Sequence, residues 1–252
     1  MLNICHAEEQ RVREEGTSLL TLYPLQDHEP HPFMLVLPGG GYQHHARHEG
    51  ETIARWFQGL GMHAGVLEYQ IEKIQPEALI QEVESSLRWV REAEKTWKVN
   101  KDQVGLIGFS AGGHLAAISA VTGREKPNLL LLGYPVITLD EPYAHAGSRH
   151  NFLGEQMSAE RLAAYSADRQ VDSSTPSAFL WTTANDASVP VENSLRFAAA
   201  LSCAGVPFEL HVFEEGRHGL GLSEENQDCR QWVRLCENWL AKHHFCRKEE
   251  MI

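Results

Sequence analysis

The sequence contains 252 residues, of which 42% are hydrophobic and 22% charged, and it has a formal net charge of −12. This length and apolar content can fill the core of one large α/β domain, so we expect residues 1–252 to form a single domain. The acidic balance argues against nucleic acid and anionic membrane surfaces as partners, and no apolar run is long enough to span a bilayer.

Apolar runs alternate with amphipathic stretches along most of the chain. A polar, acidic segment at residues 1–16 is expected to form a loose lead-in. Beyond it, apolar patterns predict strands at 18–25, 33–37, 64–69, 104–107, 129–132, 177–183 and 208–213. Apolar residues three and four positions apart predict helices at 52–60, 76–97, 159–165, 191–203 and 225–243. This alternation predicts an α/β fold with a doubly wound, mostly parallel sheet and helices on both faces.

The segment at about 138–175 interrupts the alternation of strands and helices. It is rich in Asp, Glu, His, Ser and Ala and contains only one predicted helix. Because insertions of this kind between strands usually cover a binding cleft, we expect a short cap insertion here.

The stretch around Ser110 carries the strongest chemical signal. An apolar run at 104–107 leads into Gly108-Phe109-Ser110-Ala111-Gly112, and a small-residue segment with helical character follows. A G-x-S-x-G sequence between a strand and a helix is the context of a nucleophile elbow, which raises a serine hydroxyl above the edge of the sheet. The glycines are needed because strand and helix pass close to a serine with a strained backbone. Ser110 is therefore the predicted nucleophile.

Two further strands end next to groups that suit a catalytic triad. Asp186 follows the predicted strand 177–183, and His218 follows the strand 208–213. Ligands of a parallel sheet bind beyond the carboxyl ends of its strands, and the order Ser, Asp, His is the order that this architecture uses. We predict His218 as the general base and Asp186 as the group that orients it, although either could be an ordinary loop residue.

A tetrahedral intermediate needs preorganised N–H donors where its negative charge develops. One candidate donor is the backbone N–H of Ala111, which follows the nucleophile. The glycine loop Gly39-Gly40-Gly41, after the strand 33–37, offers others, and we expect Gly40 and Gly41 to complete the oxyanion hole. The loop has neither the spacing of a phosphate-binding P-loop nor that of a dinucleotide-binding motif.

With these motifs in place, the chain resembles the α/β-hydrolase superfamily, and within it the esterase/lipase group with a glycine-rich oxyanion loop. It looks most like small bacterial acetyl esterases and acetylxylan-esterase-like sugar hydrolases. The resemblance extends from about residue 35 to the closing helix and rests on four motifs: Pro38-Gly39-Gly40-Gly41-Tyr42, Gly108-Phe109-Ser110-Ala111-Gly112-Gly113-His114, Asn185-Asp186 with Val189-Pro190, and Gly216-Arg217-His218-Gly219. Larger members of the group have a histidine where this chain has Pro38, and the chain lacks their long helical cap, so a role on long acyl chains is not expected.

The resemblance implies hydrolysis of small esters, chiefly acetyl esters of carbohydrates, through the triad and an acyl-enzyme, without metal or cofactor. An arylformamidase or a small peptidase with the same triad is an alternative that the sequence leaves open. A non-catalytic binding module is a third alternative, since fold alone does not establish function. Such a module would be expected to have lost part of the triad or the elbow, and here every part is present.

Tyr42, Gln43 and Tyr134 follow predicted strand ends and are candidates to line the substrate cleft. A metal site is conceivable at the local histidine cluster, where His44 and His48 have the spacing of one helical face and His45 lies between them. No carboxylate or cysteine was found to complete a ligand set, so no metal is expected. A small-molecule ester is the expected partner.

The amino-terminal residues lack the basic-then-apolar layout of a secretory signal. The five cysteines are an odd number and form no C-x-x-C pair. Reduced thiols and a cytoplasmic location are therefore expected.

Overall fold

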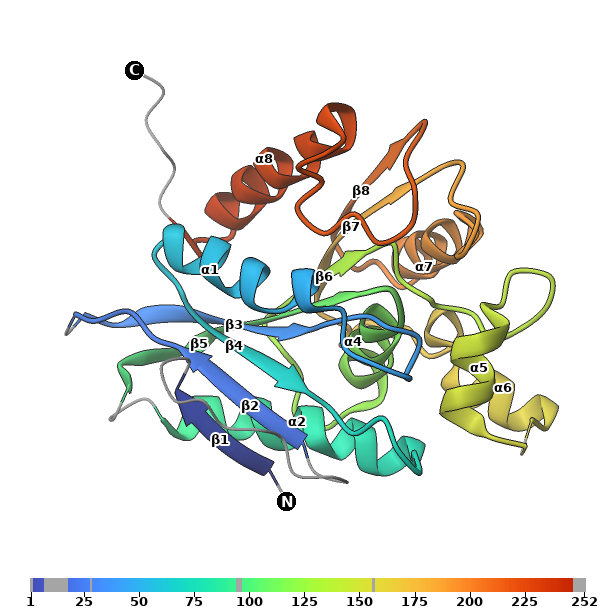
Figure 1. Ribbon diagram of the computed structural model, residues 1–252, viewed down its shortest axis with the longest axis horizontal. Helices are drawn as coiled ribbons and strands as arrows, with labels where there is room; N and C mark the ends of the chain where they lie inside the picture. Colours follow the sequence, from blue (N-terminus) through green and yellow to red (C-terminus); the bar gives the residue numbers. More distant parts are fainter. Residues whose placement is uncertain (1, 7–17, 28, 94–96, 156, 247–252) are drawn as a thin grey trace.

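The computed structural model describes residues 2–6, 18–27, 29–93, 97–155 and 157–246. Its centre is an eight-stranded sheet with the strand order β1-β2-β4-β3-β5-β6-β7-β8 (Figure 1). The β2–β4 pair is antiparallel and the other described pairs are parallel. The strands are β1 (Leu2–His6), β2 (Ser18–Tyr23), β3 (His31–Leu37), β4 (His63–Glu68), β5 (Val99–Phe109), β6 (Leu129–Gly133), β7 (Ser177–Thr183) and β8 (Phe208–Phe213). The predicted mostly parallel sheet is confirmed.

The first strand is a correction to the expected loose lead-in. Residues 2–6 form β1, which pairs in parallel with β2 from Leu2 opposite Ser18 to His6 opposite Leu22. The edge of β2 offers unpaired backbone N–H and C=O groups, and these bind a neighbouring strand whatever its side-chain pattern. The remainder of the expected lead-in, residues 7–16, lies outside the described residues.

Helices cover both faces of the sheet because side chains alternate in direction along each strand. On β3, Leu35 and Leu37 point into one core with α2, α4 and α7, whereas Met34 and Val36 point into a second core with α1 and α8. Figure 1 shows α1 and α8 on one side of the sheet and α2 on the other. The longer helices are α1 (Glu51–Gly59), α2 (Pro76–Glu92), α4 (Ser110–Thr122), α7 (Glu192–Cys203) and α8 (Gln227–Lys242).

Helix α4 differs from the amphipathic helices because it is buried on every side. Each residue from Ser110 to Val121 is buried, between the sheet, α2 and the segment 138–175. A helix that is apolar all round needs such surroundings, which explains the run of Ala, Ile, Leu and Val after the elbow. The helix therefore holds Ser110 on a rigid support.

The segment 138–175 contains α5 (Ala146–Leu153), α6 (Ala159–Tyr165) and the short 3-10 helix η2 (Ala167–Arg169). Sequence patterning predicted α6 but not α5, whose apolar residues do not repeat with a helical period. Phe152 and Tyr165 anchor the segment in the core that also contains α4. No helix among the described residues combines the length and the apolar character needed to cross a bilayer.

Candidate active site

Strand β5 ends at Phe109 and helix α4 begins at Ser110, so the serine lies at the turn between them. Ser110 has a φ of +52°, a conformation that non-glycine residues rarely adopt. A Cβ atom on Gly108 would lie 2.3 Å from the Gly112 carbonyl oxygen, and one on Gly112 would lie 2.2 Å from the Leu37 carbonyl oxygen. Both positions therefore require glycine, as the sequence motif implies.

Three side chains from three loops meet in one hydrogen-bonded row. The Nε2 atom of His218 lies 2.7 Å from Ser110 Oγ, and its Nδ1 atom lies 2.7 Å from Asp186 Oδ2. A carboxylate only accepts hydrogen bonds, so Nδ1 carries the ring proton and Nε2 is left to accept the proton of the serine hydroxyl. The structure thus brings together the three residues that the sequence analysis selected.

The environment of Asp186 keeps it ionised. Burial by itself raises the pKa of this carboxyl. The hydrogen bonds from His218 and from the backbone lower the pKa by more than burial raises it, so the net pKa is below the ordinary value. The backbone N–H groups of Ser188 and Val189 donate to Oδ1 at 2.8 and 2.9 Å. Oδ2 remains directed at His218, as a group that stabilises an imidazolium must be.

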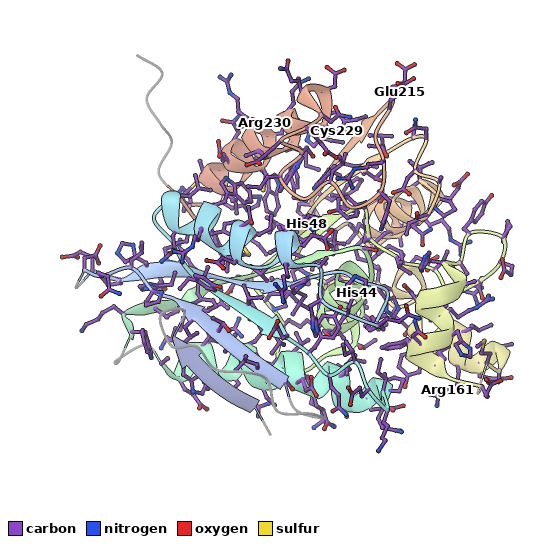
Figure 2. All side chains as sticks on the ribbon, in the orientation of Figure 1. His44, His48, Arg161, Glu215, Cys229 and Arg230 are labelled. Carbon is purple, nitrogen blue, oxygen red and sulfur yellow. The ribbon has the colours of Figure 1, made fainter. Side chains whose placement is uncertain are left out.

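Hydrogen bonds hold the loop of His218 in place on both sides of the histidine. Before the histidine, Asn185 Oδ1 accepts from the Gly216 N–H at 2.9 Å, and the Thr183 hydroxyl donates to the Gly216 carbonyl at 2.8 Å. After it, the Nε2 atom of His48 lies 2.9 Å from the Gly219 carbonyl oxygen. In Figure 2, His48 lies beside the amino-terminal end of α1. These contacts fix the position of the imidazole relative to the sheet.

The glycine loop lies directly against the nucleophile elbow. A Cβ atom on Gly39 would be 3.0 Å from Ser110 Cβ. Gly40 and Gly41 have φ values of +124° and +65°, and the Gly40 carbonyl accepts from the N–H groups of Gln43 and His44. Among the described residues, the N–H groups of Gly40 and Gly41 have no protein acceptor. The Ala111 N–H, in the first turn of α4, has no intrahelical acceptor either.

A buried carboxylate that the sequence analysis missed, Glu49, supports this loop. Its Oε2 accepts from the Gly39 N–H at 2.8 Å, and its Oε1 accepts from the Tyr134 hydroxyl at 2.5 Å. The Tyr134 oxygen in turn accepts from the Gly221 N–H at 2.9 Å. The chain Gly39–Glu49–Tyr134–Gly221 thus joins the glycine loop to the loop of His218. No sequence signal distinguishes Glu49, which directly follows His48 in a polar stretch and resembles a solvated residue.

The three candidate substrate-binding residues occupy different places. Gln43 and Tyr42 line a cavity of about 680 Å³ beside the glycine loop, although the Tyr42 side chain is almost fully buried. Tyr134 is only 2% exposed, and its ring packs edge-on against His218 with centroids 5.0 Å apart. Its hydroxyl is used by Glu49 and Gly221, so the structure gives Tyr134 an internal position rather than a place on a cleft.

Tyr42 is connected to helix α4 through His114. The Tyr42 hydroxyl lies 2.7 Å from His114 Nδ1, and His114 Nε2 lies 2.8 Å from the carbonyl oxygen of Tyr165. Burial lowers the pKa of His114 to about 4, so the ring is neutral and donates from Nε2 while it accepts at Nδ1. His114 therefore links the residue after the glycine loop to the segment 138–175.

The three clustered histidines diverge in the fold. His48 contacts the Gly219 carbonyl, whereas the His45 ring packs against Tyr69 with centroids 4.8 Å apart. His44 is exposed. Within the described ranges, no three His, Cys, Asp or Glu side chains are grouped closely enough to hold a metal ion.

Comparisons with known proteins agree with this geometry. A sequence model described as the prolyl oligopeptidase family matches residues 72–245. Endo-1,4-beta-xylanase B of Butyrivibrio fibrisolvens is 35% identical over 209 residues, which cover 76% of this chain and 33% of that protein. Acetylxylan esterase of Xylanibacter ruminicola is 34% identical over 211 residues, covering 81% of this chain and 44% of that protein. The chain thus spans less than half the length of either curated relative.

A solved structure is similar over most of both chains. It is the acetyl ester-xyloside bifunctional hydrolase of Caldicellulosiruptor lactoaceticus, with 39% identity, a TM-score of 0.86, and coverage of 90% of this chain and 88% of that chain. The family match includes α2, the elbow and the loops of Asp186 and His218. On these grounds the chain belongs to the prolyl oligopeptidase family and has the α/β-hydrolase fold.

Proposed function

We propose that this protein is a serine carboxylesterase that hydrolyses short-chain esters, chiefly acetyl esters of carbohydrates. The main support for the proposal is the hydrogen-bonded row Ser110–His218–Asp186 beside a glycine loop, in which the N–H groups of Gly40 and Gly41 have no acceptor among the described residues. Two relatives support this choice of substrate. One is named an acetylxylan esterase and the other an acetyl ester-xyloside hydrolase, so both names combine an acetyl ester with a carbohydrate.

In the first half of the proposed reaction, Ser110 Oγ attacks the acetyl carbonyl carbon while His218 Nε2 accepts the hydroxyl proton. The carbonyl oxygen becomes negative, and the N–H groups of Gly40, Gly41 and Ala111 donate to it. The bond from carbon to the sugar oxygen then breaks. The sugar leaves with the proton from His218, and the acetyl group remains on Ser110.

In the second half, water attacks the acetyl-enzyme and His218 accepts a proton from it. The intermediate collapses, acetate leaves, and His218 returns the proton to Ser110 Oγ. Asp186 stays ionised throughout and stabilises the imidazolium that forms twice in the cycle. These steps need no metal ion and no cofactor.

The family description favours one alternative, cleavage of an amide bond by the same triad. A peptidase or formamidase would use the same row of side chains and the same N–H donors, and it would differ in the alcohol or amine that the cleft accepts. The match to the xylanase covers only 33% of that protein and assigns no glycosidase activity to this chain, whereas the name of the Caldicellulosiruptor lactoaceticus hydrolase includes a xyloside as well as an acetyl ester. A binding module without activity would have no need for the tautomer and contacts of His218.

The proposal extends to the surroundings of the site. We assign residues 138–175 as a cap insertion of one domain over 1–252, with Phe152 and Tyr165 as its anchors. We also propose a cytoplasmic location, which is supported by free thiols at Cys203, Cys229, Cys236 and Cys246.

The test is hydrolysis of p-nitrophenyl acetate, butyrate and octanoate by the wild type and by Ser110→Ala. Acetate should be the preferred substrate, and kcat should fall by about 10⁴- to 10⁶-fold in the variant because the triad acts as a unit. Ser119→Ala is the matched control, since Ser119 is a buried serine on the same helix whose hydroxyl has no partner among the described residues. Near-normal turnover by Ser110→Ala would refute the mechanism. Cleavage of formanilide or peptide substrates, but of no ester, would favour the amide alternative.

A further inference from the structure

A cavity of about 680 Å³ lies next to the residues that follow the glycine loop. Its walls come from the residues after the glycine loop, from the segment 71–76 that leads into α2, and from α5 and α6. Gln43 belongs to the first wall and Asn151 to the third. The Asn151 side-chain amide also donates to the Gly41 carbonyl at 2.8 Å. The cavity and the glycine loop therefore share a wall.

Two cations, Lys73 and Arg161, line the cavity, and the Glu77 carboxylate, which is not part of the lining, interacts electrostatically with Arg161. Among the described residues, neither Lys73 nor Arg161 has a carboxylate oxygen within 4.0 Å. Arg161 Nε is buried and has no hydrogen-bond partner, and the guanidinium carbon lies 5.4 Å from the centre of the Tyr165 ring. Figure 2 shows Arg161 beside α5 and α6. The other two arginines of the segment 138–175, Arg149 and Arg169, are paired with carboxylates.

The net charge of the molecule bears on whether this pair of cations can bind an anionic ligand. The formal net charge is −12, so an anionic ligand meets repulsion over most of the surface. An anion binds only where local cations outweigh that field. Glu155 is the one carboxylate of the cavity lining, against Lys73 and Arg161. A guanidinium with a free edge suits a carboxylate or a phosphate, which it can contact with two parallel hydrogen bonds.

We propose that this cavity binds the alcohol part of the substrate, and that this alcohol is a carbohydrate with an anionic substituent, either a uronic-acid carboxylate or a phosphate. Arg161 and Lys73 contact the anion. The amides of Gln43 and Asn151 offer donors and acceptors to sugar hydroxyl groups, and Ile74 offers an apolar surface to a sugar face. The inference rests on the proposed function, because it takes the alcohol to be the group released from Ser110.

The experiment compares acetylated substrates that differ only in the anion. One pair is acetylated xylotriose with and without a glucuronic-acid branch, and the other is acetylated glucose with and without a 6-phosphate. Wild-type kcat/KM should be about tenfold higher for the anionic member of at least one pair, as for one charge-assisted contact. The pair that shows the preference identifies the carboxylate or the phosphate as the source.

The variants test whether the cavity causes the preference. Lys73→Gln combined with Arg161→Gln should lower the ratio to about one, and Glu155→Gln should raise it by removing a repulsive charge. The matched control, Arg88→Gln with Arg124→Gln, removes two exposed positive charges from a separate groove and should leave the ratio unchanged. Equal kcat/KM within both pairs would overturn the inference, and so would a preference that survives in the Lys73/Arg161 variant.

Binding separates this inference from the proposed esterase activity. Calorimetry with deacetylated glucuronic-acid xylotriose and with glucose 6-phosphate measures the cavity without any ester cleavage. At least one should bind, with a Kd about tenfold weaker in the Lys73/Arg161 variant. No binding of either by a wild type that cleaves p-nitrophenyl acetate would overturn the inference alone. Absence of ester cleavage with intact binding would instead refute the proposed function.

Discussion

At the scale of single residues, Glu49 connects the glycine loop to the loop of His218. One oxygen holds the Gly39 N–H and the other holds the Tyr134 hydroxyl, and the carboxylate is 2% exposed. The Tyr134 hydroxyl oxygen accepts a hydrogen bond from the N–H of Gly221, which lies three residues after His218. We assign Glu49 as a positioning residue, because it contacts the backbone of the glycine loop and not the reacting atoms.

Glu49→Gln should lower kcat by roughly ten- to a hundredfold and leave KM nearly unchanged. The amide can still accept from Gly39 through its oxygen, but its NH₂ group cannot accept from the Tyr134 hydroxyl. The glycine loop and the loop of His218 then lose their common support, and the N–H donors act chiefly in the transition state. Steady-state kinetics with p-nitrophenyl acetate measure this split.

Glu51→Gln is the control for Glu49→Gln. Glu51 is an exposed carboxylate two residues away, paired with Arg55 on the same helix, and its loss should leave kcat unchanged. A rise in KM with unchanged kcat in Glu49→Gln would contradict the positioning role. Equal activity of Glu49→Gln and wild type would contradict it as well.

At the scale of elements, the elbow depends on how closely β3, β5 and α4 approach one another. A Cβ on Gly112 would lie 2.2 Å from the Leu37 carbonyl and 2.4 Å from the Pro38 carbonyl, both of which are backbone atoms that cannot rotate away. Gly112→Ala should therefore force α4 away from β3 and lower the free energy of unfolding by roughly 1–3 kcal/mol or more. Urea denaturation followed by circular dichroism measures the change.

Gly59→Ala provides the matched comparison for Gly112→Ala. Gly59 ends helix α1, and a Cβ there would meet no atom within 4 Å. This substitution should stabilise the protein by about 0.5–1 kcal/mol, since alanine favours the helix and restricts the unfolded chain. A Gly112→Ala variant as stable as wild type would show that α4 tolerates the displacement.

The elements show what local pattern can predict. Strands β7 and β8 and helix α6 have the bounds that the sequence analysis expected, because their apolar periodicity begins and ends sharply. Strand β5 is longer than predicted, since Val99–Gln103 lacks a continuous apolar run. Strand β1 and helix α5 were not predicted. The edge of β2 stabilises β1, and the core around Phe152 stabilises α5, and neither contact can be read from a local sequence pattern.

At the scale of the whole molecule, two buried histidines link the stability of the fold to pH. Burial lowers the pKa of both His63 and His114 to about 4. In the unfolded chain a histidine titrates near about 6.5. Between these values the unfolded state binds more protons than the folded state, so the free energy of unfolding falls as the pH decreases from about 6.5 to about 4.

The pH dependence of unfolding checks this linkage. Each buried histidine contributes up to about 1.4 kcal/mol per pH unit inside that window and nothing above it. His114→Gln should therefore show a shallower slope than wild type between pH 6 and pH 4, while His44→Gln, at an exposed histidine, should keep the wild-type slope. Parallel slopes for wild type and His114→Gln would contradict the assignment of a neutral, buried ring.

Sequence patterning predicted the α/β class, the mostly parallel sheet with helices on both faces, and Ser110, Asp186 and His218 as the candidate triad. That choice was possible because the carboxyl ends of parallel strands meet at one edge, so a residue's place after a strand predicts its neighbours. Three features are visible only in the folded chain: Glu49 is buried between two loops, Tyr134 is internal, and Lys73 and Arg161 line one cavity. Burial and the pairing of charges depend on segments far apart in the chain, and no local pattern of residues contains that information.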